Sequence, residues 1–64
     1  MSKIQSARIM LSAILAMKKD KFIELNRTGK IGDIVYQYID VEDDSIQEQL
    51  MIIQQKQFDL TARK

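Results

Sequence analysis

The chain has 64 residues, of which 45% are hydrophobic and 30% charged, and its formal net charge is +1. It contains neither Cys nor His, which excludes disulfides and the common zinc sites and removes the usual general acid or base at neutral pH. A single domain of this size is marginally stable alone. We therefore expect oligomerisation or a partner protein to complete it.

The charges are unevenly distributed along the chain. Residues 1–30 carry seven basic and two acidic side chains, whereas residues 31–64 carry three basic and seven acidic ones. The first half therefore has a formal net charge of +5 and the second half one of −4. Two such halves attract each other if the chain folds back, or if two chains pair antiparallel.

The first predicted element is a long helix over about residues 3–27. Ser2 and Gln5 have the spacing of a capping box at its start. Its centre, residues 9–17, has eight apolar residues out of nine and no charge, Gly or Pro. A helix that is apolar on all sides is normally buried on all sides, and this short chain has few elements to cover it.

Two apolar faces of this helix have different predicted roles. One face is expected to pack against the last helix, giving a core of Leu11, Leu15, Phe22, Leu25, Ile46, Leu50, Ile53 and Leu60. The other is expected to bind a partner through Ile9, Met10, Ala13, Ala16, Met17 and Ile23, with Tyr36 joining them. The alternative is that the middle segment covers this second face within the same chain.

A turn is predicted over residues 28–33, with Gly29 in the left-handed position that ends a helix. Residues 34–40 then form either a short helix with Asp33 as its N-cap or a strand, since they are rich in β-branched and aromatic residues. A lone strand has nothing to pair with in this chain, so we expect the helix.

An acidic connection over residues 40–44 precedes the last predicted helix, residues 45–62, which a capping box of Ser45 and Glu48 begins. The core residues of this helix have heptad-like spacing, with Met51 and Phe58 flanking them. The acidic run lacks the Gly and terminal Glu of a calcium loop and is expected to be a solvated helix start. The predicted fold is a single all-α domain, a helical hairpin or three-helix arrangement with its long helices antiparallel.

The sequence predicts a non-enzymatic protein–protein interaction module, that is, an oligomerising, adaptor, assembly or regulatory protein without cofactor, metal or small-molecule substrate. The alternative is a nucleic-acid-binding regulator that contacts phosphates through Arg8, Lys18, Lys19, Lys21, Arg27 and Lys30. A third possibility is a subunit or chaperone that folds only within a larger assembly. We expect no membrane span, since the apolar run is too short, and a cytoplasmic location, since no signal peptide is recognisable.

Overall fold

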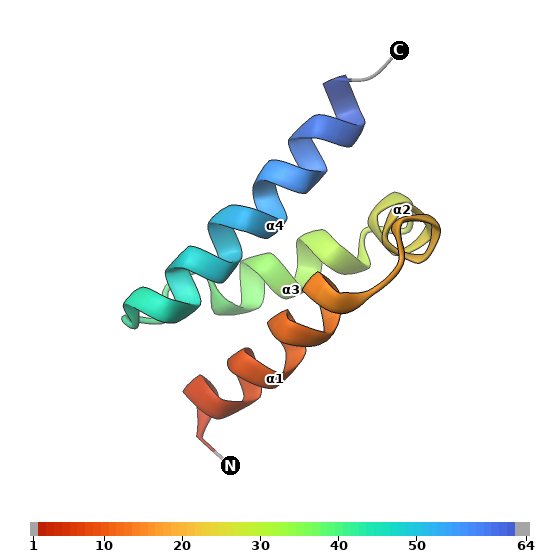
Figure 1. Cartoon of the computed structure of the whole chain (residues 1–64). Coiled ribbons are helices and arrows are strands. Elements are labelled where there is room, and N and C mark those ends of the chain that lie inside the picture. The colour runs from red at the N-terminus through yellow and green to blue at the C-terminus, as the bar shows by residue number, and fades with distance from the viewer. Residues whose placement is uncertain (1, 63–64) are drawn as a thin grey trace.

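The computed structural model describes residues 2–62 and the side chains of residues 2–61. This part of the chain forms helices and no strand, so the all-α prediction is confirmed. Figure 1 shows the helices, which are α1 (Lys3–Ala16), α2 (Lys19–Arg27), α3 (Lys30–Tyr38) and α4 (Asp44–Ala62). None of them is long and apolar enough to cross a membrane.

The prediction of one long helix over residues 3–27 is wrong, because Met17 and Lys18 interrupt it. Both residues have extended backbone, with ψ of 157° and 155°, although neither is a helix breaker. A continuous helix would be about 37 Å long, longer than any other helix available to cover it. The break instead lets α2 turn across the bundle, where Phe22 is 1% exposed. We attribute the break to this burial.

The local sequence predicted the start of α1 correctly but not the start of α4. At α1 the Ser2 hydroxyl accepts a hydrogen bond from the Gln5 amide at 3.2 Å, as predicted. At α4 the predicted cap, Ser45, is wrong. Asp43 Oδ1 accepts from the Ile46 amide at 3.0 Å, so the cap lies two residues earlier. A carboxylate at this position also interacts favourably with the positive end of the helix dipole.

The middle segment is a helix, as predicted, but it begins four residues earlier than expected. Gly29 has φ of 87°, the left-handed conformation, and is the N-cap of α3 directly after α2. Because one left-handed residue both ends α2 and starts α3, the predicted turn over 28–33 shrinks to residues 28–29. Asp33 is therefore not an N-cap and lies in the first turn of α3.

The predicted antiparallel packing of the first and last helices is also wrong, because α1 and α4 run parallel. At the start of α1, Lys3 Nζ lies 3.8 Å from Asp40 Oδ1, just before α4. Further along, Gln49 Nε2 donates to Ser12 Oγ at 3.1 Å. Residue numbers therefore rise together along the two helices (Figure 1). The direction follows from α3, which returns the chain to the start of α1 before α4 begins.

The core lies where α1, α3 and α4 meet, and α2 contributes one aromatic ring to it. The buried residues are Ala7, Leu11, Ile14, Phe22, Ile31, Val35, Tyr38, Val41, Ile46, Leu50 and Ile53. Five of the eight predicted core residues are among them. The other three, Leu15, Leu25 and Leu60, are half-buried and pack against the cluster. α1 makes its most extensive contact with α4.

The position of the α4 cap can be tested with two alanine substitutions. We expect Asp43→Ala to lower the free energy of unfolding by about 0.5–2 kcal/mol, because the Ile46 amide loses its acceptor. Ser45→Ala should change it by less than about 0.5 kcal/mol, because Ser45 is an exposed helix residue. Urea unfolding followed by circular dichroism measures both values, and the opposite ranking would return the cap to Ser45.

Candidate protein-binding site

The first helix is apolar on two opposite sides, and only one of them is covered. Its inner side is buried, with Leu11 at 0% and Ile14 at 2% exposure. On the outer side Ile9 is 60% exposed and Met10 42% exposed. The inner side of α1 is thus packed in the core, while no other part of residues 2–62 buries the outer side.

The outer face of α1 is a continuous uncharged surface. We define it by its exposed members, which are Gln5, Ile9, Met10, Ala13 and Ala16. These residues recur at helical spacing, so they lie on one side. The charged side chains of Lys3 and Arg8 lie off this side, at its two edges. Low charge is typical of the centre of a protein interface, and the small side chains let another helix approach closely.

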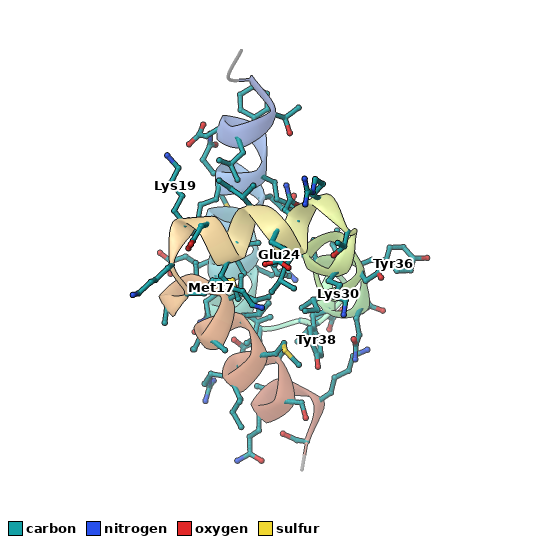
Figure 2. All side chains as sticks on the ribbon, turned by 90° about the vertical axis from the view of Figure 1, so that its right-hand side faces the viewer. Met17, Lys19, Glu24, Lys30, Tyr36 and Tyr38 are labelled. Carbon is teal, nitrogen blue, oxygen red and sulfur yellow. The ribbon has the colours of Figure 1, made fainter. Side chains whose placement is uncertain are left out.

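The structure brings together four of the seven residues predicted to bind a partner: Ile9, Met10, Ala13 and Ala16. The break in the helix separates the other three. Met17 is half-buried and packs against the core, in the angle between α1 and α2 (Figure 2). Ile23 is 41% exposed but belongs to α2, and Tyr36 is 81% exposed on α3 and points away from the molecule.

A second exposed apolar surface lies on α4 and was not predicted as a binding site. Met51 is 70% exposed and Phe58 66% exposed. They are seven residues apart and therefore share one side of the helix, with the exposed Gln54 and Gln55 beside them. The seven-residue spacing was visible in the sequence, but only the structure shows that no neighbouring described helix covers these side chains.

The basic residues proposed to contact phosphates do not form one patch. Lys19 and Lys30 lie on opposite sides of α2 in Figure 2, with Glu24 between them. The carboxylate of Asp20 is also exposed on this helix. Carboxylates interleaved with the lysines would repel a phosphate backbone. The remaining basic candidates are exposed as well and lie on α1, α2 and the residues that flank α2: Arg8, Lys18, Lys21 and Arg27.

The acidic connection before α4 has structural contacts that account for two of its carboxylates. Asp43 caps α4, and Asp40 lies within ion-pair distance of Lys3. Gln47 fastens the same segment from within α4, because its Nε2 donates to the carbonyl oxygens of Ile39 at 3.1 Å and Val41 at 2.7 Å. The connection therefore serves to hold the starts of α1 and α4 together.

No protein-family model, curated protein or solved structure matches this chain.

The difference between the two sides of α1 can be tested by truncating one residue on each. We expect Leu11→Ala to cost about 2–5 kcal/mol of unfolding free energy, because it leaves a cavity in the core. Ile9→Ala should cost less than about 0.5 kcal/mol, because its side chain is exposed in the single chain. Urea unfolding at low protein concentration gives both values, and similar costs for the two variants would mean that Ile9 is already buried.

Proposed function

We propose that this protein is a non-enzymatic protein–protein interaction module whose binding surface is the outer face of α1. The observation that carries the proposal is the exposure of Ile9, 60%, on a helix whose opposite side is buried at Ala7, Leu11 and Ile14. Removing such a side chain from water is worth about 1.5–3 kcal/mol when burial is complete. A partner that covers Ile9 and Met10 therefore gains apolar burial that the chain alone does not provide.

The character of the face also supports a protein partner. It is flat in outline, since its central members besides Ile9 are Ala13 and Ala16, and it is uncharged. Its backbone is preformed, because the inner side of α1 is packed against α4, so little conformational entropy is lost on binding. These properties suit an oligomerising, adaptor, assembly or regulatory protein. Interleaved carboxylates on α2 make phosphate binding the weaker candidate.

Site-specific photo-crosslinking in cells that naturally produce the protein tests the proposal. A photoreactive residue in place of Gln5, at the edge of the outer face, should form protein adducts. Replacing both Ala13 and Ala16 with Glu should reduce these adducts at least about tenfold, because two unpaired charges would have to be desolvated in the interface. Both substituted positions are exposed, so the variant should retain its helical circular dichroism.

Two controls make the result specific to this face. A photoreactive residue in place of Gln37, which is exposed on α3, should give few adducts. The single change Gln54→Glu, on the exposed side of α4, adds a charge elsewhere and should leave the Gln5 adducts unchanged. Adducts that survive the double Glu substitution, or equal yields from both crosslinking positions, would contradict the proposed binding surface.

A further inference from the structure

The connection between α1 and α2 lacks the local stabilisation that supports the other two connections among the described residues. Between α2 and α3, Gly29 has φ of 87°, a conformation that glycine adopts readily. There the Thr28 hydroxyl also donates to the carbonyl oxygen of Leu25 at 3.0 Å. Before α4, Asp43 Oδ1 accepts a hydrogen bond from the Ile46 amide at 3.0 Å. Both of these connections are therefore favoured by their own residues.

At the connection between α1 and α2 the local sequence favours a continuous helix instead. Met17 and Lys18 have ψ of 157° and 155°, although both residue types have high helix propensity. Lys18 is the N-cap of α2, and its side chain makes no capping hydrogen bond in the described part of the chain, because lysine has no acceptor atom. Lys19 and Lys21 then place positive charge at the positive end of the α2 dipole, opposed there by Asp20. A continuous helix would remove these penalties.

Contacts with other helices hold α2 in place in spite of this preference. Phe22 is 1% exposed, and its ring lies 5.1 Å from the Lys56 ammonium. Gln57 Nε2 also donates to Asn26 Oδ1 at 2.9 Å. With α2 fixed in this way, straightening the connection in a single chain would pull α1 away from α4. The buried apolar side of α1 would then be exposed to water, which is unfavourable.

A second copy of the chain removes that cost. We propose that two chains exchange α1, so that α1 and α2 of each copy join into one continuous helix and α1 docks on α4 of the other copy. The contacts that hold α1 within one chain are then remade between two chains. They include the approach of Lys3 to Asp40 at 3.8 Å and the hydrogen bond from Gln49 to Ser12 at 3.1 Å. Only another copy offers this same site.

The physical basis of the exchange is that only the connection changes. Short connections under strain favour the exchange of an element between identical chains. The inference does not rest on the proposed function, because α1 docks through its inner side in both forms. Exchange is slow, since α1 must leave the core of its own chain first, and it depends on concentration, since association costs translational and rotational freedom. Association through an exposed face requires no such unfolding.

Two single-cysteine chains test the exchange, because the protein has no Cys of its own. One chain carries Ser12→Cys and the other Gln49→Cys, two positions whose side chains are in contact between α1 and α4. The chains are refolded together from urea at high concentration and treated with a short thiol crosslinker. The mixed product should exceed that of Ser12→Cys with Gln54→Cys, an exposed control on α4, at least about tenfold, because proximity raises the effective concentration.

Two results of this experiment would overturn the exchange. One is a mixed product of Ser12→Cys with Gln49→Cys that stays at the level of the Gln54→Cys control after refolding together. The other is an equal yield when the same two chains are mixed already folded and crosslinked at once. That result would mean that the contact forms without α1 leaving its own core. The substituted positions are exposed or half-buried, so the variants should fold.

A glycine in the connection tests whether its helix preference drives the exchange. Lys18→Gly, introduced into both cysteine chains, should lower the mixed product at least about fivefold, because glycine is unfavourable inside a continuous helix and is an acceptable N-cap in the bent form. Lys21→Gly is the matched control. It removes the same charge but lies within α2 in both forms, so the yield should change less than about twofold. Equal effects of the two substitutions would overturn the assigned role of the connection.

Discussion

The structure depends on the burial of one side of α1 against a helix that runs parallel to it. Leu11 on α1 and Leu50 on α4 are almost inaccessible to solvent, and the ion pair and hydrogen bond described above tie the two helices in register. Because α3 and α4 fill the space on this inner side, no helix among the described residues remains to cover the outer side. The outer face of α1 is thus exposed because the few helices of this short chain pack on its inner side.

The break between α1 and α2 has the same cause, namely that few helices are available to cover apolar surface. Ending α1 at Ala16 leaves some backbone groups without helical partners, which costs free energy. Burial of Phe22 and partial burial of Met17 offset that cost. The ring of Phe22 also lies 5.1 Å from the Lys56 ammonium, a distance at which cation–π attraction contributes. A longer α1 would have kept its helical hydrogen bonds but extended beyond the helices that cover it.

Features that act within a few residues predicted that the chain is helical and where α1 begins. Contacts between residues distant in the sequence determine how the helices are arranged. The Ser2 cap and the left-handed Gly29 act over a few residues, and the core side of α1 follows from helical periodicity, so the sequence contains each of them. The break at Met17 has no local marker, because Met and Lys are good helix formers. The direction of α4 depends on how far α3 carries the chain, which periodicity does not specify.

The residues of the candidate site also fall into two groups, those that helical spacing predicted and those whose position depends on tertiary contacts. Ile9 and Ala13 were predicted because the regular spacing of α1 places them opposite the core. Met17 was grouped with them on the assumption of a continuous helix, and the break turns it inward. Asp43 and Ser45 are both good caps two residues apart, and the choice between them is made by tertiary contacts, including the hydrogen bonds from Gln47 to the preceding carbonyls.

The central claim is that, in a single copy of the chain, one apolar side of α1 is buried and the opposite apolar side is exposed to solvent. The most direct measurement is the relaxation of methyl NMR signals by a soluble nitroxide, in a sample dilute enough to be monomeric. The account predicts strong broadening for the methyl groups of Ile9 and Ala13 and little for those of Leu11 and Ile14. Equal protection of all four residues in the monomer would contradict it, because the outer side of α1 would then already be covered.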